Sequence, residues 1–325
     1  MASKSHTVVI GAGVIGLQTA LLLLQAGHSV TVVATHFPGD VDPALVYTSP
    51  KAGAHWRSQS TDPFVHKADK ETYLAWLSLV RSKGASETGL ALTPSYYFWE
   101  EEGAAETVNN FRGLWWKDYV LDFRVLPKQE LPEGVSHGVA YTTFAINPTQ
   151  YMRYLLRECQ QLGVETVRRK VASLGEAATL GEDVVAVVNC TGISARELVG
   201  DENVYPIKGQ TVLVRGESKT NRFVKTKSGW QDAVLRRPGE GTILGVSKDK
   251  DDWSNNIDQN LTKMILERCK RLAPELLVDG KFDVVRPQIG RRPARKGGIR
   301  IEIERLDVGG KDLIVCHHYG HGGTG

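Results

Sequence analysis

The distribution of apolar and polar residues near the start of the chain predicts a strand, a helix and a second strand in close succession. Thr7–Ile10 is a short β-branched run, which is typical of a buried parallel strand. The helix expected to begin near Val14 is apolar on most of its faces, as a helix packed under a sheet should be. Gly27 suits the end of that helix, and Ser29–Val33 resumes the strand pattern. These residues therefore predict a parallel βαβ unit.

The pattern changes after this unit. Tyr47–Ser58 is a loop rich in turn-forming residues, and a helical pattern follows over 70–84. Short, aromatic-rich strand patterns then appear over 93–102 and 123–131. This change indicates that a second, β-rich domain begins within the first third of the chain.

The α/β pattern returns with a helix start signal. Asn147 is a suitable N-cap and Pro148 a suitable first helical residue. Gly163 is expected to end this helix, whose apolar face is formed by Tyr151, Leu155, Cys159 and Leu162. Strand patterns follow over 164–171 and, as a nearly continuous apolar run, over 184–190.

A glycine pattern at the first turn indicates that the βαβ unit binds a dinucleotide. Residues 11–16 read Gly-Ala-Gly-Val-Ile-Gly, which fits the dinucleotide-binding pattern G-x-G-x-x-G between a strand and a helix. Gly11 permits the tight turn, Gly13 lets the backbone approach a pyrophosphate, and Gly16 lets the helix pack closely on the strand. The helix N-terminus presents free N–H groups and a partial positive charge to that pyrophosphate.

One part of the dinucleotide pattern is missing. An acidic residue should follow the second strand and hold the adenosine ribose. Here the strand runs into Ala34-Thr35-His36, and the nearest acid is Asp40. Either Thr35 and backbone groups replace the acid, or the ribose is bound less tightly.

The glycine motif alone leaves NAD, NADP and FAD open as cofactors. Strand patterns over 209–216 and 241–246 return to the β-rich part, so the α/β domain is interrupted twice. A nicotinamide-dependent dehydrogenase usually builds its nucleotide domain from one contiguous stretch, and the interleaving therefore favours FAD over NAD.

Composition and charge argue against several other classes of protein. No run within the 325 residues reaches the roughly 18 apolar residues that a membrane-spanning helix requires. The N-terminus enters the first strand directly, without the pattern of a signal peptide. A net charge of +3 is too small to indicate a nucleic-acid partner. Without a C-x-x-C spacing, disulfides and zinc are disfavoured, and buried thiols are expected at Cys159, Cys190, Cys269 and Cys316.

Several segments, taken in order along the chain, resemble the FAD-dependent D-amino acid oxidases and their D-aspartate oxidase relatives. They are "VVIGAGVIGL", "SPKAGAHW", "INPTQYMRYLL", "VVNCTG", "GRRPAR" with the later "RIE", and "HHYGHGGTG". The resemblance implies an α/β fold in which a glutathione-reductase-like, FAD-binding Rossmann domain is interleaved with a β-rich substrate domain. We expect residues 1–57, 146–197 and 283–325 to form the FAD-binding domain, and 58–145 and 198–282 the substrate-binding domain.

The resemblance also implies non-covalent FAD, bound over the glycine turn and along a second glycine-rich loop at the end of the chain. The expected cofactor contacts are Gly11, Ala12, Gly13, Val14, Ile15, Gly16, Thr35, Ser49, Ala52, Gly53, Ala54, Val171, Cys190, Thr191, Gly192, Gly322, Gly323, Thr324 and Gly325. In the family a final helix follows the second loop, often with a peroxisomal address, so the chain is expected to be truncated at its C-terminus.

By the same resemblance, the reaction is the oxidative deamination of a D-amino acid. The Cα hydrogen passes as hydride to flavin N5, the imino acid hydrolyses to a 2-oxo acid and ammonia, and oxygen reoxidises the flavin to give hydrogen peroxide. The cofactor carries this chemistry while the protein orients the Cα–H bond, so no acid–base residue and no metal is expected. The expected partners are the small-molecule substrate and oxygen, with neither nucleic acid nor membrane, and a homodimer is one candidate assembly.

A substrate carboxylate needs a cationic anchor, and one segment is rich in cations. This segment holds Arg286, Arg291, Arg292, Arg295, Lys296 and Arg300. A guanidinium can pair with a carboxylate through two parallel hydrogen bonds. The family pattern assigns the anchor to Arg292, and the other five are interpreted as solvated surface charges. Trp230, His55 and Gly323 are the further expected substrate contacts, although His55 is equally well explained as a packed side chain.

The sequence departs from the family at a second carboxylate ligand. The family places a tyrosine in a strand of the substrate domain, and its position falls near Ala233, where there is no tyrosine. Trp230 and the pair Arg236-Arg237 lie in this segment instead. Either these arginines reach the pocket and favour an acidic side chain, or they are exposed residues beside a Pro-Gly turn.

Three alternatives stay open from the sequence: a D-aspartate oxidase, a nicotinamide-dependent dehydrogenase, and a flavin-binding paralogue that has lost turnover. The location implied by the resemblance is the peroxisome, and otherwise the cytoplasm.

Overall fold

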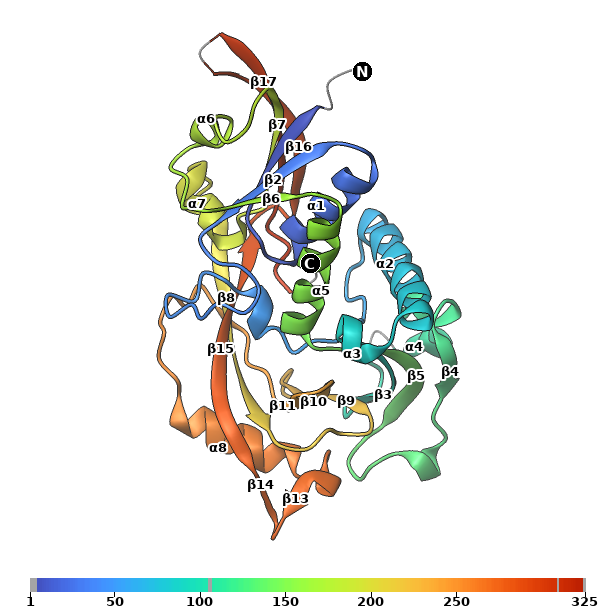
Figure 1. The fold of residues 1–325 in the computed structure, drawn as a ribbon. Helices are drawn as coiled ribbons and strands as arrows, with labels where there is room; N and C mark the ends of the chain where they lie inside the picture. The colour runs from blue at the N-terminus through green and yellow to red at the C-terminus, as the bar shows by residue number, and fades with distance from the viewer. Residues whose placement is uncertain (1–4, 105–106, 309, 324–325) are drawn as a thin grey trace.

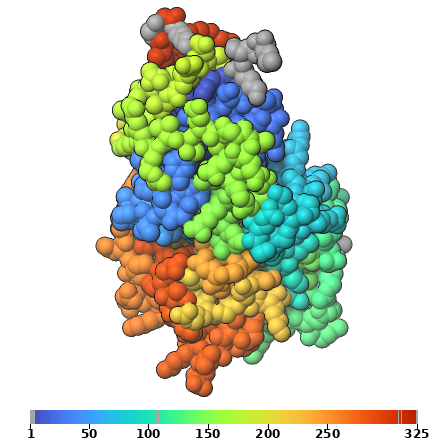
Figure 2. Space-filling model, viewed as in Figure 1, coloured from blue at the N-terminus to red at the C-terminus, as the bar shows by residue number. Residues whose placement is uncertain are grey.

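The structure, a computed structural model, describes residues 5–104, 107–308 and 310–323. It is built around two large sheets, one in each half of an elongated molecule (Figure 1). The space-filling view shows that N-terminal and central residues, in blue and green, together form much of the upper half (Figure 2). Residues from the later part of the chain, in yellow and orange, form most of the lower half.

The smaller sheet draws together the beginning, the middle and the end of the chain. Its strands are β1 (His6–Ile10), β2 (Ser29–Ala34), β6 (Glu165–Arg168), β7 (Val184–Asn189), β16 (Arg300–Val308) and β17 (Lys311–Tyr319). They lie in the order β16-β17-β7-β1-β2-β6. All neighbouring pairs are parallel except β16 and β17, which are antiparallel. β1 lies between β2 and β7, so the turn that follows β1 opens at the carboxyl edge of the sheet.

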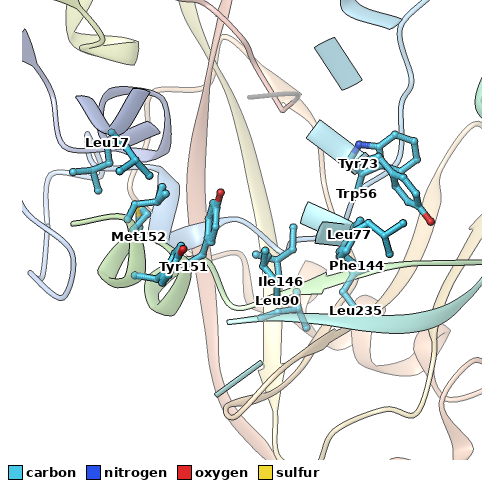
Figure 3. Packing of buried hydrophobic residues seen from close by; sticks show 14 of the residues in the cluster. Leu17, Trp56, Tyr73, Leu77, Leu90, Phe144, Ile146, Tyr151, Met152 and Leu235 are labelled. Atoms are coloured by element: carbon cyan, nitrogen blue, oxygen red, sulfur yellow. The ribbon is translucent and has the colours of Figure 1, made fainter. Parts of the chain in front are cut away.

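Two long helices pack against each other beside this sheet. α1 (Val14–Gln25) follows β1 directly, and α5 (Pro148–Gln161) crosses it. The Cys159 thiol donates a hydrogen bond to the Leu17 carbonyl (3.6 Å), and the Tyr151 hydroxyl donates one to Gln18 Oε1 (3.2 Å). Figure 3 shows Leu17 and Met152 close together at this contact. The helix pair therefore fixes the position of the first turn of α1.

The larger sheet forms the lower part of the molecule. Its strands are β3 (Leu90–Trp99), β4 (Leu121–Val125), β5 (His137–Ile146), β8 (Val204–Val214), β9 (Asn221–Lys225), β10 (Gln231–Arg237), β11 (Gly241–Leu244), β12 (Asp249–Lys250) and β15 (Val284–Arg295). Their order is β12-β8-β11-β10-β9-β3-β5-β4, and β15 pairs with β8. Only β3 and β9 are parallel; the other neighbouring pairs are antiparallel.

The remaining elements cover the two sheets. The remaining helices are α2 (Pro63–Ser82), α3 (Ala85–Thr88), α4 (Val108–Phe111), α6 (Leu174–Ala177), α7 (Ala195–Leu198) and α8 (Gln259–Cys269). Short 3-10 helices span Ser49–Lys51, Trp115–Asp118, Lys128–Glu130, Gly192–Ser194 and Pro274–Leu276, and β13 (Leu277–Val278) forms a small hairpin with β14 (Lys281–Phe282). α8 is tied to the larger sheet by an ion pair between Arg268 Nε and Asp232 (2.7 Å).

The largest apolar cluster joins the two halves of the molecule. It contains Leu17 and Met152 beside the smaller sheet, and Leu90, Phe144 and Leu235 on the larger one. These side chains lie along one continuous band in Figure 3. Burial of this band stabilises the two halves as one body, because apolar area is removed from water on both sides.

The local signals in the sequence predict most of these elements correctly. The βαβ unit of the first 34 residues is confirmed, and so are the N-cap at Asn147 and the strand after Asp183. The predicted helix over 70–84 begins earlier, at Pro63, because the Asp62 carboxylate caps it by accepting a bond from Phe64 N (2.8 Å). The predicted strand over 123–131 is wrong in its second half, where Lys128–Glu130 forms a 3-10 helix.

The arrangement of strands bears on how the chain is divided. β15 falls at the start of 283–325, which the sequence assigns to the FAD-binding domain, yet it pairs with β8 along its length in the larger sheet. The division of the chain into an FAD-binding and a substrate-binding domain stays a prediction.

No helix in the described part of the chain is both long and apolar enough to cross a bilayer. All four cysteines are free thiols, and Cys316 is only partly buried.

We expect Asn147→Ala to lower the free energy of unfolding by about 2 kcal/mol. The Asn147 side chain caps α5 by accepting a bond from Gln150 N (3.2 Å) and donates one to the Pro238 carbonyl (3.0 Å). The variant loses both bonds at a site only 8% exposed. Urea unfolding measures the change, with Asp62→Ala at the exposed cap of α2 as the matched control, for which we expect a smaller loss. Equal losses in the two variants would contradict the bridging role of Asn147.

Candidate functional site

A cavity of about 1110 Å³ lies where the smaller sheet meets the larger one. From the smaller sheet it is lined by the ends of β1, β2 and β7, at Ile10, Val33 and Cys190. Its opposite wall is the larger sheet, which contributes Gly209, Thr211, Phe223, Ala233, Leu235 and Ile243. A ligand in this cavity would therefore touch both sheets.

The glycine turn forms one end of the cavity, and its geometry requires glycine. Gly11 has φ +109°, and a Cβ there would lie 2.5 Å from the Cys190 carbonyl oxygen. A Cβ on Gly16 would overlap the Gly11 carbonyl oxygen, so β1 and α1 could not pack as they do. Gly13 leaves open space on the cavity side, since its Cβ would meet only Ser49 Oγ, at 3.1 Å. The turn is thus a cradle that side chains would fill.

The N-terminus of α1 faces this cradle. Gly13 is the N-cap residue and offers no side chain, so the first N–H groups are free of a side-chain cap from that position. Val14 N donates instead to Ser49 Oγ (3.2 Å), and both residues line the cavity. The positive end of the helix dipole therefore points at a place where a pyrophosphate would fit.

The end of β2 lacks an acidic ribose ligand. Thr35 and His36 line the cavity, together with Val171, which follows the neighbouring strand β6. The Asp40 carboxylate is not part of the lining, because it accepts a bond from Phe37 N (2.8 Å) and pairs with Arg168. These two contacts, the Arg168 bond first, lower the pKa of Asp40. Asp40 is thus used in a local turn, which leaves Thr35 as the side chain at the expected ribose position.

The middle of the cavity is built by three loops that touch one another. Thr48 Oγ1 donates to the Arg291 carbonyl (2.6 Å), which ties the first loop to β15. Gly322 N donates to the Pro293 carbonyl (2.8 Å), which ties the C-terminal loop to the same strand. A Cβ on Gly192 would lie 3.6 Å from Pro293 Cγ. Backbone from distant parts of the chain therefore approaches closely around the end of β15.

Most of the residues expected to bind the cofactor line this one cavity. They are Gly11, Ala12, Gly13, Val14, Ile15, Thr35, Ser49, Ala52, Gly53, Ala54, Val171, Cys190, Thr191, Gly192, Gly322 and Gly323. Gly16 is not in the lining, because it packs under Gly11. Thr324 and Gly325 lie outside the described residues. A role for each residue in binding stays a prediction.

Arg292 lines the same cavity. It is on β15, opposite Ile207 of β8, and its Nη1 donates to the carbonyls of Ile207 and Ser247 (both 3.3 Å). Gly209 leaves the room for the guanidinium, since a Cβ there would overlap it, and Gly323 lies against Arg292 Cδ. Burial lowers the pKa of Arg292. The charge of the Asp249 carboxylate acts on Arg292 but forms no ion pair with it, so the guanidinium can pair with an anionic ligand.

His55 lines the cavity on the side of β9. Its ring packs on Phe223 at 4.3 Å between centroids, and its Nε2 is buried without a hydrogen-bond partner among the described residues. Burial, followed by the positive charge of Arg57, holds the pKa of His55 well below its usual range. His55 is therefore a neutral ring on the cavity wall.

Trp230 does not reach the cavity. It precedes β10, whose alternating side chains Gln231, Ala233 and Leu235 line the cavity. Trp230 is on the opposite face, where Arg268 of α8 lies 5.9 Å above its ring. The side-chain period of a strand is two, so an odd shift in the expected register moves a residue to the other face.

The arginine pair at the end of β10 also lies away from the cavity. Arg236 pairs with Glu217 (2.9 Å), and Arg237 pairs with Glu240 (2.8 Å). Arg237 is only 2% exposed and donates a further bond to the Pro50 carbonyl (3.1 Å), so it is not a solvated turn residue. The pair therefore neither reaches the cavity nor lies wholly in solvent, because Glu217, Glu240 and the Pro50 carbonyl fix the two guanidiniums elsewhere.

Two cations that the sequence did not single out line the cavity instead. Arg57 follows His55 by two residues in a strand-like stretch and thus lies on the same side. Lys248 follows β11 and remains exposed at the cavity wall. The alternation from His55 to Arg57 is the signal that could have identified Arg57; no comparable signal marks Lys248.

The described residues thus combine a glycine cradle, a helix N-terminus and a buried guanidinium around one cavity. This combination defines an α/β dinucleotide-binding enzyme in which a substrate pocket adjoins the nucleotide site. No cluster of potential metal ligands is found among the residues described.

Comparison with known proteins makes the class specific. Residues 6–325 match the family model described as FAD dependent oxidoreductase. The chain is 33% identical to a D-amino-acid oxidase from Schizosaccharomyces pombe, covering 98% of this chain and 91% of the relative. It is 35% identical to a D-aspartate oxidase from Talaromyces thermophilus, with coverage of 98% and 90%. The chain therefore belongs to the FAD-dependent oxidoreductase family.

Solved structures support the same fold. A glycine oxidase from Bacillus cereus aligns with a TM-score of 0.74 at 17% identity, covering 99% of this chain and 91% of that one. A glycine oxidase from Geobacillus kaustophilus aligns with a TM-score of 0.73 at 19% identity and the same coverage. The fold class expected from the sequence is confirmed, and FAD is confirmed as the cofactor of the family.

We expect Gly13→Val to abolish FAD binding. The added side chain would occupy the open side of the cradle, beside Ser49, where the backbone must approach the pyrophosphate. Flavin absorbance per mole of purified protein measures occupancy. Gly84→Val is the matched control, because a Cβ on Gly84 meets nothing nearer than Ser86 Oγ at 3.8 Å. A Gly13→Val protein with full flavin content would refute this placement of the cofactor.

Proposed function

We propose that this chain catalyses the oxidative deamination of D-amino acids with FAD as the cofactor. The observation that carries the proposal is the single cavity in which the glycine cradle and the Arg292 guanidinium both lie. The 33% identical relative that is named a D-amino-acid oxidase supports the same reaction. The proposed substrate is a small D-amino acid, and the proposed electron acceptor is molecular oxygen.

The reaction removes a hydride from Cα and a proton from the amino nitrogen. The resulting imino acid takes up water and releases a 2-oxo acid and ammonia. When bound, FAD accepts the hydride, and its two electrons then pass to oxygen to give hydrogen peroxide. The chain's own task is to bind the amino acid and to aim its Cα–H bond.

Arg292 is the proposed carboxylate anchor. Its guanidinium is partly buried, bonded to two carbonyls, and makes no ion pair with a carboxylate among the described residues. A substrate carboxylate would supply the missing negative charge through a charge-assisted pair of hydrogen bonds. Ala233 lies fully buried where the resemblance places a second, tyrosine ligand, so that ligand is missing from the proposed clamp.

No acid–base residue of the chain is needed for this reaction. Burial lowers the pKa of His321 to about 4, and that of His55 lies well below its usual range. The His321 ring is therefore neutral above pH 5, and the lowered pKa of His55 likewise favours its neutral form, so both rings can shape the pocket without exchanging protons. This agrees with a role of the chain in orientation rather than in general acid–base catalysis.

Several further parts of the proposal rest on the resemblance. These are the division into an FAD-binding and a substrate-binding domain, a homodimer as one assembly state, and a peroxisomal location. A protein that is purified with bound nicotinamide and without flavin would contradict the proposal as a whole.

We expect Arg292→Ala to lower kcat/KM for D-alanine by about two to four orders of magnitude, because the substrate carboxylate would be left buried and unpaired. The flavin content should stay at the wild-type level. Peroxide release measures turnover, and Arg295→Ala is the matched control, since Arg295 pairs with Asp201 (2.7 Å) and does not line the cavity. A normal kcat/KM in Arg292→Ala would show that another residue anchors the carboxylate.

We also expect turnover of only the D enantiomer. If Arg292 holds the carboxylate at a fixed place, one enantiomer alone can direct its Cα–H bond toward the cofactor. Peroxide release with D- and L-alanine at equal concentrations measures this selectivity. Equal rates with the two enantiomers, or activity with L-alanine alone, would contradict the assignment.

A further inference from the structure

Arg57 is a buried guanidinium without an anionic partner in the part of the chain that the structure describes. It is 8% exposed, and its Nε and Nη1 atoms have no hydrogen-bond partner among the described residues. Its guanidinium carbon lies 4.1 Å from the centroid of the Tyr97 ring and 4.6 Å from that of Phe223. These two rings hold the guanidinium in place by cation–π contact but do not neutralise its charge.

The other strongly buried arginines of the chain have polar partners for part of the guanidinium, although Arg237 Nη1 and Arg291 Nε also lack a hydrogen bond among the described residues. Arg237 pairs with Glu240, and Arg291 donates bonds to Asn255 and to main-chain carbonyls. A guanidinium that is removed from water without such partners is destabilising. Arg57 therefore stands out as a group whose partner is not within the described protein.

Arg57 faces the cavity from the side opposite Arg292. Phe223, on which it lies, belongs to β9, whereas Arg292 belongs to β15. Strands β10, β11 and β8 lie between them. Where these three strands line the cavity they form a common floor with Ile207, Gly209, Thr211, Gln231, Ala233, Leu235 and Ile243, and the two guanidiniums lie at its two sides.

Lys248 lines the same cavity as the two guanidiniums. It follows β11, the central one of the three strands, and it lines the cavity while remaining exposed to solvent. Partial burial and the positive charges of Arg292 and Arg57 lower the pKa of its ammonium group. Lys248 therefore lies near enough to each guanidinium for that positive charge to act on it.

The described lining offers these three cations no carboxylate as a partner, although the charge of Asp249 acts on Arg292 from outside the lining. Glu197 is the only Asp or Glu in the described lining, and it pairs with Lys170 (2.7 Å) at the nucleotide end. A ligand that brings one negative charge would neutralise Arg292 and leave Arg57 unpaired. A ligand that brings two would neutralise both.

We propose that Arg57, with Lys248 beside it, binds the side-chain carboxylate of an acidic D-amino acid whose α-carboxylate pairs with Arg292. The inference rests on the proposed oxidation of D-amino acids and assigns its substrate class, namely D-aspartate or D-glutamate. The sequence offered Arg236 and Arg237 as candidates for binding an acidic side chain, but these pair with Glu217 and Glu240. We assign that role to Arg57 and Lys248.

The first test compares Arg57→Met with the wild type on two substrates. Methionine keeps an apolar stem against Tyr97 and Phe223 and removes the charge. We expect wild-type kcat/KM to be higher for D-aspartate than for D-alanine, and the ratio of the two to fall by about 100-fold or more in Arg57→Met. Arg57→Lys should restore part of the ratio, and Arg236→Met, at an ion pair remote from the cavity, should leave it unchanged.

The second test measures binding without turnover. Malonate and acetate are titrated into the flavin-loaded protein, and the flavin absorbance change gives each Kd. We expect wild type to bind malonate more tightly than acetate, and Arg57→Met to lose that preference. Melting temperature and flavin content show whether each variant is folded and loaded.

The outcomes separate this inference from the proposed function. An unchanged substrate ratio in Arg57→Met, or a wild type that prefers D-alanine, would overturn the role of Arg57 and leave the oxidase reaction intact. Loss of flavin from a folded Arg57→Met would assign Arg57 to the cofactor and also overturn it. If no D-amino acid is oxidised but malonate binding depends on Arg57, the anion subsite stands and the proposed reaction falls. Should Arg57→Met not fold, the ratio and the malonate preference in Arg57→Lys decide, and both must be weaker than in wild type.

Discussion

The antiparallel pairing of β8 with β15 holds the two ends of the cavity in a fixed relation. β15 belongs to the larger sheet, yet its last residues bond to the loop that follows β17 of the smaller sheet, through Gly322 and Pro293. Arg292 lies one residue before that contact. Because side chains alternate along a strand, a slip by one residue would turn Arg292 away from the cavity. The register of one strand pair therefore sets the position of the proposed anchor relative to the glycine turn.

Positively charged side chains outnumber acidic ones in the described lining of the cavity. The described lining includes cations at both the nucleotide end and the substrate end, and Glu197 is its only acid. In a cleft with protein walls, charges of one sign reinforce one another and raise the local concentration of ligands of the opposite sign. Both the cofactor, through its phosphates, and a carboxylate substrate are anionic, so one electrostatic character serves both.

The parts of the fold and of the site that sequence predicts well are those with a local physical cause. The turn at residues 11–16 needs glycine because of contacts within the βαβ unit and with the neighbouring strand, and the Asn147 cap depends on a residue three positions away. The substrate end has no such local cause. The side of the sheet on which Trp230 lies depends on the register of β10, the position of Arg237 depends on Glu240, and that of Arg57 depends on rings at positions 97 and 223. The family resemblance supplied Arg292, which local patterns could not separate from its neighbours.

The position of Arg57 between the Tyr97 and Phe223 rings links the stability of the protein to the ligand in the cavity. An uncompensated positive charge between Tyr97 and Phe223 works against folding of the ligand-free protein. An anion that pairs with it removes this effect in the folded state only, so part of the binding free energy appears as resistance to unfolding. Abundance of the protein in a cell would then follow the supply of its anionic ligands, since the ligand-free form is the one most open to degradation.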